Sequence, residues 1–279
     1  MPKNLIMNRL KKTKTLLLAF FLCLSIFSNA QNTNTFSVKP DKHFLKSFWQ
    51  DSKKVALAPK YWNSKQWIAA GVVVGGTFLL YQYDMEINNY FQSRQTHLGE
   101  NLSKNVLEPF GSGLYSFPTL GLFYAQGMIW KNPRSQKVAL MGAKAYIISG
   151  IFVQFPKFLI NRHRPYHNKP SQHDIFEGPS LSLYKAFPSG HSTSVFAIAA
   201  VIASEYKSTI WVPIVSYTLA SFSALSRIYD NKHWATDVFI GSVLGWSIGK
   251  LVYNSNNWKV KTYPMITPES AGLSFNYQF

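Results

Sequence analysis

Six apolar segments separated by polar breaks predict the helices of this chain. Breaks such as Lys131–Arg134 and Glu205–Ser208 interrupt them, and no repeated alternation of apolar and polar residues indicates a sheet between them. Segments of this kind, joined by short polar connections, are typical of an all-α bundle. The six predicted helices cover residues 66–83, 113–130, 137–160, 190–204, 209–225 and 237–253.

The polar tail Asn254–Phe279 breaks the helical pattern and predicts a short β-hairpin. Apolar residues alternate with polar ones over Leu273–Phe279, which is strand periodicity. We expect Val260–Ile266 to pair with this segment across a turn that contains Pro, Ser and Gly. Outer-membrane barrels also end in an aromatic residue, but no series of alternating strands precedes this one.

Residues 1–30 have the pattern of a secretory signal peptide. Five Lys and Arg residues precede the apolar run Leu16–Phe27, and the small residues Ser28 and Ala30 predict cleavage before Gln31. An uncleaved signal-anchor helix is the alternative, although the apolar run is short for a membrane span. We therefore divide the chain into a signal peptide (1–30), an N-terminal extension (31–65), a helical domain (66–253) and a C-terminal tail (254–279).

Composition narrows the chemistry that the exported chain can perform. Its only cysteine, Cys23, lies in the signal segment, so the mature chain has no disulfide, thiolate nucleophile or Cys-based metal site. Lys and Arg outnumber Asp and Glu by 29 to 12. This basic balance favours an anionic membrane surface as partner, and no basic helix or RNA-binding motif indicates nucleic acid.

Two segments in the middle of the chain could bind an anion: the first contains two cations, and the second is a predicted helix start. Lys157 and Arg164 are seven residues apart, so we expect both on one face of a helix that Pro165 ends. Further along, Ser189 is a natural helix N-cap, and Gly190 lets an anion approach the backbone. The free amides and the dipole at such a helix end favour phosphate. A plain helix cap gives no reason for the following His191.

A third segment, Ser226-Arg227-x5-His233-x3-Asp237, adds a cation, a histidine and a carboxylate. The fifth helical segment ends near Arg227, and Asp230–Lys232 indicates a turn. His233 and Asp237 are four residues apart at the start of the sixth segment and therefore share a face. A carboxylate there can hold one ring nitrogen and leave the other free to attack.

Together these segments resemble the type 2 phosphatidic acid phosphatase (PAP2) family, which shares its site with class A acid phosphatases and vanadium haloperoxidases. Eleven positions match in order, spacing and identity, and the resemblance is clearest over residues 137–253. It implies a six-helix bundle. The matching residues are Lys157, Arg164, Pro165, Pro188, Ser189, Gly190, His191, Ser226, Arg227, His233 and Asp237.

The resemblance also implies a role for each site residue. His233 is the expected nucleophile, Asp237 orients it, and His191 is the acid that protonates the leaving group and then the base that activates water. The phosphate oxygens are expected to bind Lys157, Arg164, Ser189, Gly190 and Arg227. Because cations neutralise the phosphate, we expect no metal ion and no other cofactor. Asp84, Glu86 and Glu108 match no motif and receive no role.

The reaction that the resemblance implies is hydrolysis of a phosphate monoester or pyrophosphate, in envelope lipids, through a phosphohistidine. The alternatives are a soluble periplasmic acid phosphatase of broad specificity, a lipid phosphotransferase, a vanadium haloperoxidase, and a non-enzymatic protein with a relic site. The motifs bind phosphate and do not choose the rest of the substrate. They also leave the oligomeric state open.

The predicted location is the bacterial envelope, with the site facing the periplasm. A membrane-embedded bundle is favoured over a soluble periplasmic domain, although most segments are near the lower length limit for a span. Lys144 and Lys250 lie inside segments and are costly if they face lipid. A cleaved signal followed by three crossings would also put the site on the cytoplasmic side. Either one early segment does not cross, or the bundle is a periplasmic domain that touches the membrane without crossing it.

Overall fold

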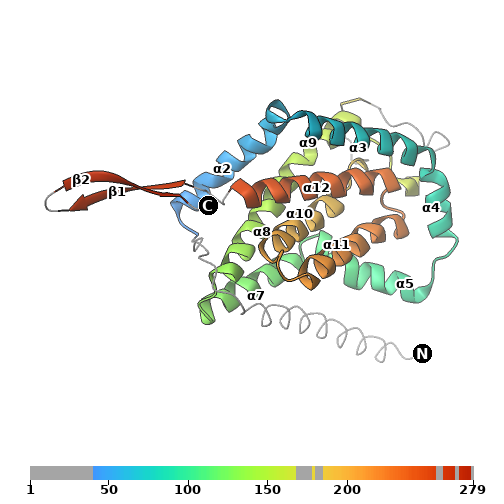
Figure 1. Ribbon diagram of the computed structural model, residues 1–279. Helices are drawn as coiled ribbons and strands as arrows, with labels where there is room; N and C mark the ends of the chain where they lie inside the picture. Colours follow the sequence, from blue (N-terminus) through green and yellow to red (C-terminus); the bar gives the residue numbers. More distant parts are fainter. Residues whose placement is uncertain (1–39, 168–177, 180–184, 256–259, 268–269, 278–279) are drawn as a thin grey trace.

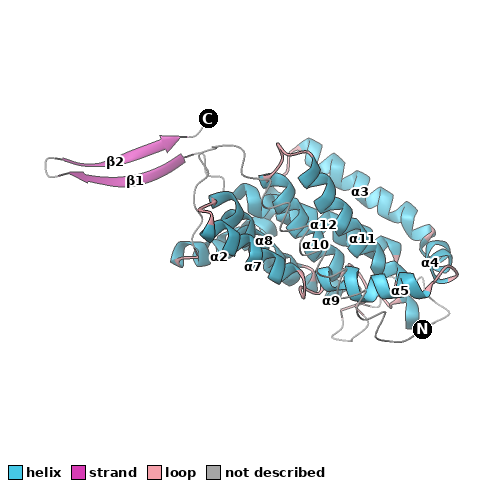
Figure 2. Cartoon of the chain, turned by 90° about the horizontal axis from the view of Figure 1, so that it is seen from below, coloured by secondary structure: helices cyan, strands magenta, loops and turns pink. Residues whose placement is uncertain are grey.

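Helices that pack side by side make up most of the computed structural model, which describes residues 40–167, 178–179, 185–255, 260–267 and 270–277 (Figures 1 and 2). The predicted signal peptide lies outside these residues. The longer helices are α2 (Lys42–Leu57), α3 (Ser64–Gln82), α4 (Asp84–Gln92), α7 (Ser116–Ile129), α8 (Pro133–Phe152), α9 (Gln154–Ile160), α10 (Gly190–Glu205), α11 (Trp211–Tyr229) and α12 (Ala235–Ser255).

Each of the six predicted apolar segments forms helix, which confirms the all-α fold. They correspond to α3, α7, the pair α8 and α9, α10, α11 and α12. The structure adds helices that the apolar pattern did not predict, because they are short or interrupt their apolar residues with polar ones. These are α2 and, between α3 and α7, α4, α5 (His97–Leu102), a π-helical turn η3 (Ser103–Leu107) and α6 (Glu108–Gly111).

Helix α10 lies at the centre of the bundle and packs against α8, α11 and α12 (Figure 1). Its small and β-branched residues are buried on nearly every side, as expected for a helix that is apolar all round. Two glycines of α12 make the close approach to α10 possible. A Cβ at Gly245 would lie 2.1 Å from the Thr193 carbonyl oxygen, and one at Gly241 would lie 2.5 Å from that of Ser189.

The third predicted segment differs from its expected form in two places. The helix breaks at Val153 between α8 and α9, because Pro156 has no N–H to donate to the carbonyl of Phe152. It ends at Asn161, in left-handed geometry (φ 45°), rather than at Pro165. The prediction that Lys157 and Arg164 share a helix face is therefore wrong, since Arg164 lies in the non-helical segment after α9.

Buried ion pairs hold the helices together away from the motifs. Lys144, in the middle of α8, is fully buried and donates to Asp51 of α2 at 2.6 Å and to Ser47 at 2.8 Å. Its charge therefore faces α2, not lipid. At the start of α8, Arg134 and Lys137 bind Glu205 of α10 at 3.3 and 2.8 Å.

The C-terminal tail forms the predicted hairpin. Strand β1 (Val260–Thr267) pairs antiparallel with β2 (Ser270–Tyr277), in a register that joins Val260 to Tyr277 and Thr267 to Ser270. Figure 1 shows the two strands extending away from the helices. The hairpin therefore adds no residue to the motif region.

Candidate active site

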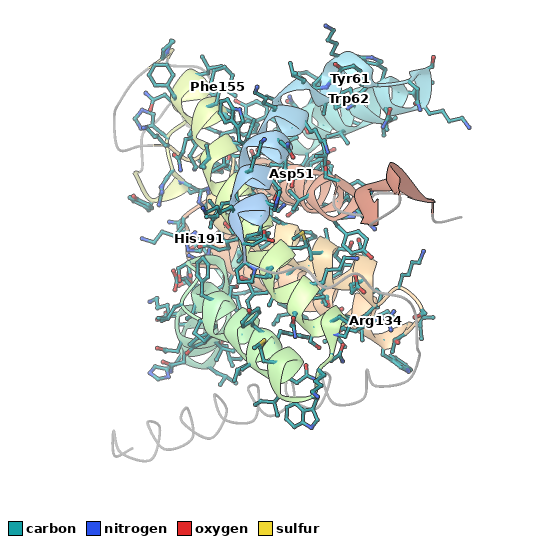
Figure 3. The ribbon with its side chains drawn as sticks, turned by 90° about the vertical axis from the view of Figure 1, so that its left-hand side faces the viewer. Asp51, Tyr61, Trp62, Arg134, Phe155 and His191 are labelled. Atoms are coloured by element: carbon teal, nitrogen blue, oxygen red, sulfur yellow. The ribbon has the colours of Figure 1, made fainter. Side chains whose placement is uncertain are left out.

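The three motifs converge at one end of the bundle, where α10 and α12 begin and α11 ends (Figure 1). A backbone hydrogen bond of 2.9 Å from Ser189 N to Asp237 O joins the second motif to the third. The Arg164 guanidinium acts electrostatically on His191, Arg227 and His233 and so links the first motif to both. Figure 3 shows His191 on the opposite side of the molecule from Arg134.

The start of α10 has the predicted cap. The Ser189 side chain is fully buried and accepts from Ser192 N, which satisfies one of the free amides of the first turn. Gly190 is the first helical residue, and a Cβ added there would make only ordinary contacts, at 3.8 Å from the Lys157 side chain and 3.9 Å from Val153. Packing within the protein therefore does not require glycine at this position.

Three cations surround this helix end, each placed by different contacts. Lys157 is buried, and its Nζ donates to the carbonyl of Lys185 at 2.8 Å. Arg227 is buried against Asp230, which binds its guanidinium, and its Nε donates to Ser226 Oγ at 3.3 Å. The Nε of Arg164 is buried and has no partner among the described residues. These contacts hold two cations in place and leave donor capacity for an anion.

His233 and Asp237 form the predicted pair, although His233 lies two residues before α12 begins. Its Nδ1 is 3.6 Å from Asp237 Oδ2, longer than a hydrogen bond, and Oδ2 also accepts from Trp234 N at 2.9 Å. Burial, together with Lys157 and Arg164, lowers the pKa of His233 to about 4 against the opposing effect of Asp237. The ring is therefore neutral above that pH, as a nucleophile must be.

His191 has a carboxylate partner that no motif predicted. Its Nε2 lies 3.0 Å from Glu108 Oε1, at the start of α6, and both side chains are about a third exposed. Burial and the nearby Arg227 lower the pKa of His191, whereas Glu108 raises it. Glu108 is 83 residues away in sequence, so only the tertiary structure identifies it.

Asp84 is a second carboxylate that sequence reasoning missed. It is the first residue of α4 and almost fully buried, and it binds Arg162 at 2.7 Å. Arg162 in turn binds Asp237 at 2.8 Å. The signal that could have found it is a lone Asp that follows a long apolar segment directly, because such a charge needs a buried partner. Glu86, the other unassigned acid of α4, makes no such contact to the motifs.

The chemistry of these groups is that of phosphoryl transfer. The neutral His233 lies in the field of Lys157 and Arg164, and His191 lies at a helix N-terminus in the field of Arg227 and Arg164. Among the described residues, no group of three or more His, Cys, Asp or Glu side chains is placed to hold a metal ion.

Comparison with known proteins identifies the family. The PAP2 superfamily model matches residues 139–261. A decaprenylphosphoryl-5-phosphoribose phosphatase of Mycobacterium tuberculosis is 32% identical over 146 residues, which cover 52% of this chain and 75% of that protein. The chain belongs to the PAP2 superfamily. The motifs of this PAP2 protein all lie inside the matched region.

Two lipid A 1-phosphatases are also similar to this PAP2 chain. The protein of Porphyromonas gingivalis is 41% identical over 76 residues, which cover 27% of this chain and 17% of that protein. This chain therefore matches about a sixth of the length of that relative. The protein of Rhizobium johnstonii is 26% identical over 229 residues, which cover 72% of this chain and 86% of that protein.

Two helical stretches of the PAP2 chain are long and apolar enough to cross a membrane, by length and composition. They are Pro133–Ile160, which joins α8 and α9, and Ala235–Ser255, which is α12. In each, half of the most apolar stretch is buried inside the protein. Core helices of soluble proteins also have these properties.

Proposed function

We propose that this protein is a metal-independent phosphatase that hydrolyses a phosphate monoester or pyrophosphate of an envelope lipid, with His233 as the nucleophile. The observation that carries the proposal is the neutral, buried His233 beside Asp237, with Lys157 and Arg164 facing it. A neutral imidazole next to converging cations is suited to attack a phosphate that those cations hold.

The reaction proceeds in two steps. His233 Nε2 attacks phosphorus while Asp237 faces Nδ1; the bond from phosphorus to the lipid oxygen breaks, and His191 gives that oxygen its proton. In the second step His191 takes a proton from water, the water oxygen bonds to phosphorus, and the bond to His233 breaks to release phosphate. Lys157, Arg164, Arg227 and the amides at the start of α10 stabilise the charge on the phosphate oxygens in both steps.

A lipid substrate is favoured over a soluble one by the relatives and by the surface of the helices. The similar proteins are phosphatases of lipid A and of a prenyl-linked sugar phosphate by name. Large apolar side chains are exposed along α3 and α11, where no other described element covers them, which suits contact with a membrane. On α3 they are Trp67, Ile68, Val72, Val74, Phe78 and Leu79.

The proposal is tested by covalent labelling of the full-length protein with radiolabelled lipid phosphates, quenched in acid or base. We expect His233→Ala to abolish both turnover and the base-stable phosphohistidine. His191→Ala should retain labelling but turn over about 10²–10⁴-fold more slowly, with a smaller loss for nitrophenyl phosphate, whose leaving group scarcely needs a proton. The matched control is His97→Gln, an exposed histidine on α5.

Several outcomes would overturn the proposal or choose an alternative. Label that persists in His233→Ala excludes that residue as nucleophile. The assays contain EDTA, so turnover that is lost on chelation and restored by a divalent cation contradicts the metal-free mechanism. Equal rates on lipid and soluble monoesters favour an acid phosphatase of broad specificity, and transfer to an added alcohol favours a phosphotransferase. Bromide oxidation with vanadate and peroxide, without hydrolysis, favours a haloperoxidase.

A further inference from the structure

Arg162 is a buried cation that belongs to none of the motif positions, although it lies inside the first motif. Its side chain is 2% exposed. Nη1 donates to Asp237 Oδ1 at 2.8 Å and to Thr236 Oγ1 at 2.6 Å, and Nη2 donates to Asp84 Oδ2 at 2.7 Å. The guanidinium thus bridges two carboxylates, one of which faces the proposed nucleophile.

Asp84 binds the same part of α12 from the other side. Its Oδ1 accepts from Thr236 N at 2.9 Å, and its Oδ2 accepts from Thr236 Oγ1 as well as from Arg162. Because Thr236 directly precedes Asp237, these bonds fix the turn of helix that carries it. The first residue of α4 therefore anchors the first turn of α12 across 152 positions of sequence.

The remaining contacts leave Asp237 one orientation. Oδ1 is bound by Arg162, while Oδ2 accepts from Trp234 N and points toward Nδ1 of His233. Because both oxygens have partners, the plane of the carboxylate is fixed with one oxygen toward His233.

We propose that Asp84 and Arg162 are positioning residues that set the orientation and the effective charge of Asp237, and thereby the reactivity of His233. This inference rests on the proposed function, because it assigns a purpose to the Asp237–His233 pair. Neither residue touches the substrate; each acts through Asp237.

The second carboxylate matters because of the charge that develops during attack. A neutral imidazole becomes cationic when it bonds to phosphorus, and a negative Asp237 stabilises that cation. Arg162 alone would neutralise Asp237. Because Asp84 also binds the guanidinium, it offsets part of the positive charge of Arg162. The negative charge of Asp237 therefore acts more strongly on His233. The carboxylates also keep Arg162 charged, since they raise its pKa although burial lowers it.

The expected effect on pH dependence follows from the groups that face His233. These are Asp237 on α12, Lys157 on α9 and Arg164 in the segment after it. Without the negative charge of Asp84, the positive charge of Arg162 acts more strongly on Asp237 and His233. The pKa of His233 should then fall further, and its cation should be harder to form in the transition state.

The test compares Asp84→Asn with Asp51→Asn in the full-length protein. Asparagine keeps the shape of Asp84 and its acceptor for Thr236 N but removes the charge. We expect kcat to fall by about tenfold or more, as for other outer partners of a catalytic group, with KM nearly unchanged. The acid limb of the kcat/KM profile should move to lower pH. Asp51 is the matched control, because it too is a buried carboxylate paired with a buried cation, Lys144, away from the motifs.

A second variant, Arg162→Lys, keeps the charge but loses the fork that binds both carboxylates. We expect it to lower kcat, since one ammonium group cannot hold both Asp84 and Asp237 in place. An Asp84→Asn protein that matches Asp51→Asn in kcat and acid limb overturns the inference. So does failure of both variants to fold when Asp51→Asn folds, which makes the pair purely architectural. An inactive wild type, in contrast, defeats the proposed function.

Discussion

At the scale of single residues, burial sets the protonation of both histidines. The pKa of His233 is lowered to about 4 by burial, and then by Lys157 and Arg164 against Asp237. That of His191 is lowered by burial and Arg227 against Glu108. Both shifts disfavour the charged ring. The proposed mechanism needs His233 neutral and His191 protonated, so the pH window of activity lies between the two pKa values.

The kcat/KM profile of the wild type is therefore expected to be bell-shaped with an acidic optimum. Activity should rise as the pH increases through about 4, where His233 loses its proton. It should fall again as the pH increases further, because His191 loses its proton at a pH lower than the usual histidine value of about 6.5. Steady-state rates from pH 3 to 9, with stability measured in parallel, provide the test. A plateau that extends above neutral pH would contradict the assigned roles.

Stability should follow the same shifts. An unfolded chain binds protons at these histidines below about pH 6.5, whereas the folded chain keeps His233 neutral down to about 4. The contribution of His233 to stability is thus fully present above pH 6.5 and is lost as the pH falls toward 4. The parallel stability curve separates loss of activity by protonation from loss of the fold.

At the scale of helices, the sequence predicted the elements that are apolar and missed those that tertiary contacts create. The six apolar segments predicted α3 and α7 to α12, and the predicted bounds differ from the observed ones by a few residues. Helices α4 and α6 are short, and their partners lie far away in sequence. Asp84 and Glu108 were missed for that reason: a carboxylate shows its partner only when the chain has folded.

Glycines at the junction of α10 and α12 provide a prediction at this scale. Gly190→Ala should fold as the wild type does, because the new Cβ meets ordinary contacts, yet it should weaken phosphate binding by filling space beside Lys157. Gly245→Ala should destabilise the fold, since its Cβ would lie 2.1 Å from the Thr193 carbonyl oxygen.

Thermal unfolding and inhibition by inorganic phosphate or vanadate measure the two effects separately. The expected pattern is normal unfolding with weak inhibition for Gly190→Ala, and early unfolding for Gly245→Ala. Tight vanadate binding to Gly190→Ala would show that the anion does not sit at this helix end.

At the scale of the whole molecule, motif charges at one end of the bundle are combined with exposed apolar helix faces. The motif charges gather at one end, while α3 and α11 expose large apolar side chains along their lengths. Two stretches are suited to membrane spans, and the only buried charge within them away from the motifs and the helix ends, Lys144, is paired with Asp51. This arrangement supports the proposal that the protein is held in the envelope membrane with its site at one surface.

We expect the full-length protein to stay with the membrane fraction after alkaline carbonate washing, and its first residue to be Gln31. The physical reasons are the exposed apolar side chains and the signal-like N-terminus. Quantitative immunoblots of washed membranes and N-terminal sequencing provide the measurements. Folded protein released into the supernatant would favour a periplasmic enzyme that only touches the bilayer.

The site has two differently built sides: the junction of α10 and α12, which is packed backbone to backbone, and Glu108 of α6. Ser189 and Asp237 are joined backbone to backbone, and a Cβ at Gly241 would lie 2.5 Å from the Ser189 carbonyl oxygen, so any larger side chain there would disrupt this junction. Glu108 instead stands on a single turn of helix after a π-helical turn, and it meets His191 only through its side chain. We therefore expect Glu108 to tolerate substitution without loss of packing, whereas the α10–α12 junction does not.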